Sequence, residues 1–454
     1  MAKGGLYKHH LKRELGLAEA TFYGLGIIIG AGIYVLLGSA AGTAGNSVWL
    51  SFLISAIIAA FTGLSYCELS SRYPHEAAEY IYASKAFGPK LLPFLIGWLL
   101  IITSAFSAAT VALGFAGYFG NMFGTPLALT AIVLLVVLSI INFRGIKESA
   151  DISVVLSILQ IVGLLIVIFF AIPHLGSVDY FSTPMGTLPL GFGGVAAAAA
   201  LVFFAYIGFD TIPKISDETR KPSKTIPKAL IWSLLISTVL YIVVAVSVVS
   251  IIPWSELATS TAPLADTVAR AAGPWWGSVV TIMAYCATIS TVLIILVAGS
   301  RMIYGMAEEG AIPKFLSAVH PKRRTPFVAI FLMLLLSMFF VYAGDLVTVA
   351  NMTTAGMFIV FIVVNASLIV VRRKPGHNPP FKVPLNIGKF PILALFGLIT
   401  SIYLLLQFEP VIYAYEAATL FVGLMLYGLV KKEENAVDRT IGRMMRKGRK
   451  PTFS

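Results

Sequence analysis

The sequence predicts an all-α integral membrane protein, and three observations carry this fold class. The chain of 454 residues is 58% hydrophobic and only 12% charged, whereas a soluble globular chain carries about 25% charged residues. Its apolar residues form long runs that are bounded by charges, glycine or proline. Nearly all its lysines and arginines fall between alternate runs. This composition excludes a soluble enzyme, a disordered scaffold and a nucleic-acid-binding domain.

The apolar runs, taken in order, predict twelve membrane-spanning helices. Each crossing takes about 20 residues, so twelve crossings use just over half of the chain and leave short loops. We place them at residues 17–37, 47–70, 91–118, 127–141, 153–172, 191–209, 226–252, 275–306, 326–343, 346–371, 389–407 and 410–430. An amino-terminal tail, residues 1–16, precedes them, and a basic tail, residues 431–454, follows them.

The distribution of basic residues predicts that both tails are cytoplasmic. With the amino terminus inside, 32 of the 33 lysines and arginines fall in predicted cytoplasmic segments or near the cytoplasmic ends of the spans, and only Arg270 falls outside. Cytoplasmic loops of membrane proteins carry this excess of positive charge. An odd number of spans would scramble the partition, so it supports an even number. We interpret the basic tail as a topology signal against anionic lipid of the cell membrane, not as a nucleic-acid site.

The polar residues predict neither a catalytic site nor a metal site. Cys67 and Cys286 lie inside apolar runs without metal-ligand spacing. No pair of nucleophile and base, metal-ligand cluster or phosphate-binding loop stands out. We therefore expect a chain that is not an enzyme and that holds no resident cofactor.

Two of the predicted spans contain interruptions. The first has Gly26, Gly30 and Gly32 within its apolar run, and the sixth has Gly208 just before Asp210. The alternatives are a close helix crossing for the first and an ordinary helix end for the sixth. These two spans are the first helices of two five-helix halves, residues 17–172 and residues 191–371. The last two predicted helices, residues 389–430, follow the second half. Interrupted spans at matching positions indicate an inverted-repeat transporter with its substrate at the breaks.

An unwound turn in the membrane suits an amino acid substrate. The N–H groups at the start of a half-helix carry partial positive charge that attracts a carboxylate. Carbonyl groups at the end of the other half can accept hydrogen bonds from an ammonium group. The backbone alone can therefore bind both ends of a zwitterion.

The sequence resembles the amino acid-polyamine-organocation permeases, which have the LeuT-type fold of two inverted five-helix repeats, over roughly residues 10–430. Five pieces carry the resemblance in order along the chain. They are Gly26–Tyr34, Tyr66–Leu69 with Arg72–Pro74, Gly97–Trp98, Phe203–Asp210 and Gly299–Tyr304 with Glu309–Pro313. The resemblance implies twelve helices, of which the first and sixth are broken and the last two are additions to the repeats.

By this resemblance, the two breaks bind the substrate. The N–H groups expected to hold its carboxylate belong to Gly30, Ala31 and Gly32. The carbonyl groups expected to hold its amine belong to Phe204, Ala205 and Ile207. An aromatic ring would cap the substrate as a gate, from Phe204, Tyr206 or Phe209; the alternative for each ring is ordinary helix packing.

The residues that would couple transport to an ion remain open at this point. Some proton-coupled relatives have a lysine where this chain has Gln160, and a glutamine does not titrate. Gln160 either bridges helices by hydrogen bonding, for example to Ser290, or faces an ion together with Ser290 and Thr291. Asp210 and Glu68 are the other candidates for binding H⁺ or Na⁺, although we expect Glu68 to lie at the cytoplasmic interface.

The resemblance implies a secondary active amino acid transporter of the plasma membrane that works by alternating access. The absence of a deep acid favours neutral amino acids. The alternatives are an exchanger of cationic amino acids or polyamines, and a membrane-embedded sensor that binds an amino acid without moving it. We expect a monomer or a loose homo-oligomer.

Overall fold

The structure is a computed structural model that describes residues 15–73, 78–89, 91–144, 146–187, 191–342, 344–376 and 378–446. Of the predicted tails, residues 1–14 and 447–454 lie outside the described residues, as does Pro74 of the second motif. The α-helices are α1 (Leu17–Ile28), α2 (Ala31–Ala44), α3 (Val48–Arg72), α4 (Ala78–Phe87), α5 (Leu91–Phe123), α6 (Leu127–Arg144), α7 (Ile146–Ala171), α8 (Phe192–Val202), α9 (Pro222–Ile251), α10 (Trp254–Leu257), α11 (Pro263–Ala272), α12 (Pro274–Glu308), α13 (Phe327–Val341), α14 (Leu346–Val371), α15 (Ile392–Leu405) and α16 (Pro410–Arg446).

The short elements complete an all-α fold. The 3₁₀ helices are η1 (Gly45–Ser47), η2 (Ile172–His174), η3 (Phe203–Tyr206), η4 (Phe209–Glu218) and η5 (Lys314–Ser317). Two antiparallel hairpins contain the strands, β1 (Ser182–Thr183) paired with β2 (Gly186–Thr187) and β3 (Asn386–Ile387) paired with β4 (Phe390–Pro391). Both hairpins lie in loops, so the predicted all-α class is confirmed for the described part of the chain.

Eight helical segments of the described chain are long and apolar enough to cross a membrane. Four shorter apolar helices accompany them, at Leu17–Ile28, Ile158–His174, Phe327–Val341 and Ile392–Leu405. Each predicted span overlaps one of these helices, and the first overlaps two. The chain is therefore a multi-pass membrane protein, while the number of twelve crossings stays a prediction.

The first predicted span is broken in the structure, and its end was predicted wrongly. The helix stops at Ile28 and restarts at Ala31, then runs to Ala44 instead of residue 37. The prediction failed at Gly38, which packs against a neighbour: a Cβ there would lie 2.6 Å from the Leu257 carbonyl oxygen. Small residues in a membrane helix allow close packing, so this glycine does not end the helix.

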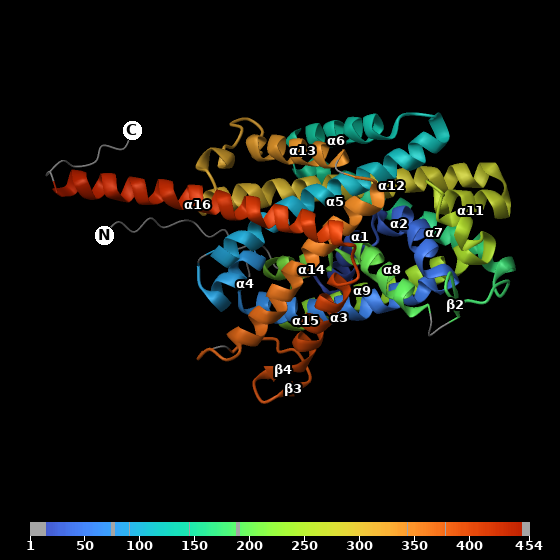
Figure 1. The fold of residues 1–454 in the computed structure, drawn as a ribbon, viewed down its shortest axis with the longest axis horizontal. Coiled ribbons are helices and arrows are strands. Elements are labelled where there is room, and N and C mark those ends of the chain that lie inside the picture. The colour runs from blue at the N-terminus through green and yellow to red at the C-terminus, as the bar shows by residue number, and fades with distance from the viewer. Residues whose placement is uncertain are drawn as a thin grey trace.

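Other helices also extend beyond their predicted apolar spans. The helix predicted at residues 153–172 begins earlier, at Ile146. The last helix runs beyond residue 430 through the first two thirds of the predicted basic tail, as far as Arg446. Lysine, arginine and glutamate are good helix formers, so the change from apolar to charged residues ends the apolar span without ending α16. Figure 1 shows α16 as a long red helix that projects from the bundle.

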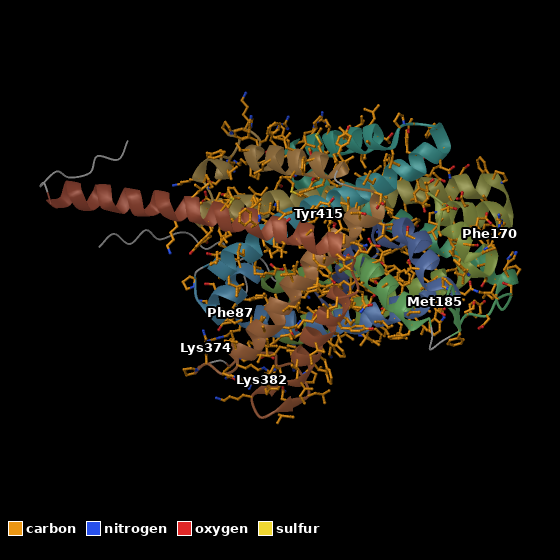
Figure 2. The ribbon with its side chains drawn as sticks, in the orientation of Figure 1. Phe87, Phe170, Met185, Lys374, Lys382 and Tyr415 are labelled. Carbon is orange, nitrogen blue, oxygen red and sulfur yellow. The ribbon has the colours of Figure 1, made fainter. Side chains whose placement is uncertain are left out.

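The packing of the bundle places the two broken helices at its centre. Helix α2 packs against α8 and η3, and α1 packs against α9. Helix α3 packs against α8 and α9, and α12 packs against α5 and α7. Residues from predicted cytoplasmic segments, Phe87, Lys374 and Lys382, lie at one end of the molecule, and Phe170 and Met185 lie at the other (Figure 2).

Candidate functional site

The break in the first predicted span places the start of a helix inside the protein. Gly30 is extended (φ −108°, ψ −154°) and precedes the first residue of α2. Its N–H donates back to the Ile28 carbonyl at 2.8 Å, and the Ala31 N–H donates to Thr291 Oγ1 of α12 at 3.0 Å. The N–H groups of Gly32 and Ile33 follow in the first turn, where an α-helix offers no acceptor within itself. This end of α2 can accept a carboxylate.

The break in the sixth predicted span is a 3₁₀ segment followed by a turn at Ile207 and Gly208. The regular helix α8 ends at Val202, and η3 follows it. Gly208 has φ +120°, a conformation that only glycine adopts without strain. The Gly208 N–H donates to Asp210 Oδ1 at 3.1 Å, so the carboxylate of Asp210 satisfies a backbone donor within this turn. The sequence therefore located this interruption correctly.

The two breaks lie in contact with each other. A Cβ on Gly32 would lie 2.6 Å from Ala205 Cα and 2.8 Å from Ala205 Cβ. The hydroxyl of Tyr241, from α9, lies 2.6 Å from the Ile28 carbonyl oxygen and 3.1 Å from that of Ala205. A single buried side chain therefore bridges both breaks, and its one hydrogen serves two carbonyls.

The predicted carbonyl ligands already accept hydrogen bonds in this conformation. The Phe204 carbonyl accepts the Ile207 N–H at 3.2 Å, and the Ala205 carbonyl accepts from Tyr241. Each carbonyl has a second lone pair, so both can still accept a hydrogen bond from an ammonium group. Ile207 is half-buried at the end of η3.

The predicted gate aromatics are buried in the surrounding helices. Tyr206 is fully buried, and its hydroxyl donates to the Phe52 carbonyl of α3 at 3.1 Å. The Phe209 ring is also fully buried and lies 5.3 Å from the ring of Phe361 in α14. Phe204 is 5% exposed. Packing therefore holds all three rings, and a gating role stays a prediction.

Gln160 does not form the predicted hydrogen bond to Ser290. Its side chain is fully buried, and neither its amide nitrogen nor its amide oxygen has a hydrogen-bond partner among the described residues. Its backbone carbonyl instead accepts from the Tyr34 hydroxyl of α2 at 2.5 Å. Thr291 is the residue of α12 that reaches the break, since it accepts from Ala31 and donates to the Ala287 carbonyl at 2.8 Å.

Glu68 is buried beneath a predicted cytoplasmic segment, and its position at the cytoplasmic interface stays a prediction. Its carboxylate is fully buried and forms an ion pair with Arg372, at the end of α14, with the guanidinium Nε 2.7 Å from Oε1. The Val383 N–H donates to Oε2 at 2.7 Å. The loop after α14 therefore covers the acid, a contact between residues 304 positions apart that the sequence did not reveal.

Three buried polar residues were not predicted from the sequence. Tyr241 is one of many tyrosines in apolar runs, and no local signal marks it. Glu79 of α4 is fully buried and accepts from the Tyr66 hydroxyl at 3.2 Å. Glu416 lies inside the predicted span 410–430, where a lone acid in an apolar run is itself a signal. Within the described ranges, no group of three or more His, Cys, Asp or Glu side chains could hold a metal ion.

Comparison with known proteins identifies similar transporters. A family model described as amino acid permease matches residues 15–425. A branched-chain amino acid permease of Bacillus subtilis is 31% identical over 451 residues, which cover 94% of this chain and 95% of the relative. A methylthioribose transporter of Bacillus subtilis is 28% identical with the same coverage. A vacuolar cationic amino acid transporter of Arabidopsis thaliana is 28% identical over 83% of this chain and 66% of its own length.

The close approach of the breaks predicts the effect of a single methyl group. In Gly32→Ala the new Cβ overlaps the backbone of Ala205, and forcing extra atoms into a packed site costs about 1–3 kcal/mol. We expect a loss of amino acid binding of about 5- to 150-fold, measured by ligand-induced thermal stabilisation of the purified protein. Gly428→Ala, where nothing lies within 4 Å of the added Cβ, is the control. Equal binding by the two variants would contradict the assignment.

The buried ion pair predicts a large loss of stability when one partner is removed. Glu68→Gln leaves Arg372 buried without its counter-charge, which costs about 3–5 kcal/mol. Arg270→Gln removes the ion pair with Glu256, whose side chains are 47% and 51% exposed. Such an exposed ion pair contributes about 0–1 kcal/mol to stability. Thermal unfolding in detergent should therefore show a much larger drop in Tm for Glu68→Gln. Similar small shifts would show that the pair does not hold α3 to α14.

Proposed function

This chain belongs to the amino acid permease family, and from that premise we propose that it is a secondary active amino acid transporter working by alternating access. The family model spans most of the chain, and the relatives are transporters, so the protein is not an enzyme. The observation that carries the proposal is the contact between the two helix breaks at Gly32 and Ala205.

The substrate lies between the breaks, with its carboxylate at the start of α2. Gly30, Ala31 and Gly32 provide the N–H groups. Thr291 accepts the Ala31 N–H in this conformation, so the carboxylate would replace the threonine hydroxyl there. The substrate amine meets the carbonyls of Phe204, Ala205 and Ile207. Because backbone groups bind both ends, the substrate needs no charged side chain of the protein at this depth.

The chain has twelve crossings in two inverted five-helix repeats, followed by α15 and α16. Packing between counterpart helices supports this arrangement. Helix α2 packs against α8, α3 against α9, α5 against α12 and α6 against α13, so each of these helices contacts the one in the same place of the other half. The protein resides in the cell membrane with both termini cytoplasmic, as a monomer or a loose homo-oligomer.

The substrates are neutral amino acids with apolar side chains. The break is bordered by Ile27, which faces Gly208, and by the half-buried Ile207. Asp210 already caps the Gly208 N–H. A relative is a branched-chain amino acid permease. The second candidate function is exchange of cationic amino acids or polyamines. Three observations favour it: the free lone pairs of the carbonyls, the nearby Asp210 and the cationic amino acid transporter among the relatives.

Either H⁺ or Na⁺ drives transport, unless the protein exchanges substrates. Gln160 cannot titrate, and Glu68 is engaged with Arg372, which leaves Asp210 as the candidate for a proton at the breaks. Gln160, Ser290 and Thr291 are the candidates for an ion site. A sensor that binds without transport is the remaining alternative, and the match of transporters along nearly the whole chain argues against it.

Uptake by the purified protein in liposomes tests the proposal. We expect labelled leucine to enter, and unlabelled leucine, isoleucine and valine to compete with it better than arginine or spermidine. Leucine methyl ester and N-acetyl-leucine should compete poorly, because each lacks one charged end and a hydrogen bond to a charged group contributes about 1.5–3 kcal/mol. A proton gradient, a sodium gradient and preloaded substrate distinguish the driving forces. Binding without uptake under every condition would favour the sensor.

A further inference from the structure

The last helix presents its one membrane-embedded acid to the protein interior. Most of α16 is exposed within its candidate span, including Phe421, Met425 and Leu429. Glu416 is different, with only 3% of its surface exposed. Its chain neighbour Tyr415 marks where α16 meets the bundle (Figure 2).

Helix α16 is anchored beside α5 and α14 at this depth. It packs against both helices. The indole N–H of Trp98 in α5 donates to the Thr419 carbonyl at 2.9 Å, one turn from Glu416. The anchored contact fixes which side of α16 faces inward, so the burial of the carboxyl group follows from specific packing.

Neither carboxyl oxygen of Glu416 has a hydrogen-bond partner within the described part of the chain. The hydroxyl of Thr103 in α5 also has no hydrogen-bond partner there. Both converge on Gly356 of α14, because a Cβ at that position would lie 2.5 Å from Thr103 Oγ1 and 3.5 Å from each Glu416 oxygen. Ser104 and Thr110 of the same helix instead donate to their own helix backbone.

No charged residue lies on either helix that packs against Glu416. The sequences of α5 and α14 contain no Asp, Glu, Lys, Arg or His, and their only tyrosine is Tyr118, whose hydroxyl donates to the Tyr34 carbonyl. The other titratable groups of α16 are Tyr413, Tyr415, Tyr427 and the charges from Lys431 onward. An ionised carboxylate without a partner is costly in such surroundings. One carboxyl and one hydroxyl are also too few oxygens to replace the shell of a metal cation.

We propose that Glu416 is a proton-binding site of the transporter, which holds a proton in this conformation and releases it when α14 moves. The proposal rests on the proposed function for its role in the cycle. Only the O–H bond of the carboxyl group forms and breaks, and the proton comes from water and returns to it. This site is separate from the breaks and requires no titration of Gln160, Asp210 or Glu68.

Helix α14 connects Glu416 to the substrate site. The ring of Phe358, two residues from Gly356, lies 4.7 Å from the ring of Phe203 in η3. Phe361 lies 5.3 Å from Phe209, just beyond the second break. A rearrangement of η3 therefore shifts α14 against Glu416 and changes what the carboxyl group faces. Proton binding and substrate binding are then linked through one helix.

Infrared spectroscopy of the full-length protein in detergent tests the proton site without any substrate. At neutral pH we expect the C=O stretching band of a protonated carboxylic acid, lost in Glu416→Gln and kept in Glu409→Gln, which alters an exposed acid at the start of the same helix. Raising the pH should remove the band from the folded wild type. The site assignment is wrong if no acid band depends on Glu416, and proton release is excluded if the band persists at every pH that leaves the protein folded.

Uptake into liposomes tests whether proton binding at Glu416 is coupled to substrate transport. With the best substrate of the uptake panel, Glu416→Gln should lose accumulation driven by a proton gradient, down to the level without a gradient, while exchange against preloaded substrate continues. Gradient-driven accumulation equal to that of Glu409→Gln would overturn the coupling. Should the wild type carry no amino acid, the proposed function fails, whereas the infrared band still decides whether Glu416 binds a proton.

Discussion

An interrupted helix inside a membrane must find partners for its backbone within the protein, because lipid offers neither donors nor acceptors. This constraint explains the residues around both breaks. Thr291 accepts the N–H of Ala31, Tyr241 donates to the carbonyls of Ile28 and Ala205, and Asp210 accepts the N–H of Gly208. Helices α9 and α12 therefore support the irregular backbone. These hydrogen bonds stabilise both breaks.

The same constraint accounts for the proposed chemistry. The supporting side chains satisfy part of the broken backbone and leave the first turn of α2 and the second lone pairs of the η3 carbonyls for a ligand. A zwitterion has the two charged ends that these groups require. In the proposed site backbone groups bind the substrate, which leaves the charged residues of the molecule for other purposes. The pair of Glu68 and Arg372 holds α3 to α14, and Glu416 stands alone behind α14.

Much of this arrangement could be predicted from the sequence, because its signals are local. Apolar runs located the helices, and glycines within two runs located both breaks. Helices extend beyond the predicted apolar spans where the local signal was ambiguous: Gly38 allows close packing against Leu257, and the charged residues after residue 430 continue a helix. Contacts between distant residues were beyond prediction. Glu68 meets Arg372 across 304 positions, and nothing beside Tyr241 in the sequence indicates that it bridges two breaks. Gln160 was identified as important, yet only the structure shows that its amide has no partner in the described chain.

Substrate protection of a cysteine at the breaks tests the central claim, that the amino acid binds between them. Ile207→Cys would be placed in a background without the two native cysteines, Cys67 and Cys286, and its rate of labelling by a membrane-permeant maleimide measured with and without leucine. The account predicts slower labelling with leucine, whereas Met185→Cys, in an exposed loop, should label at one rate throughout. Unchanged labelling of Ile207→Cys, under conditions where the same protein carries leucine, would contradict it.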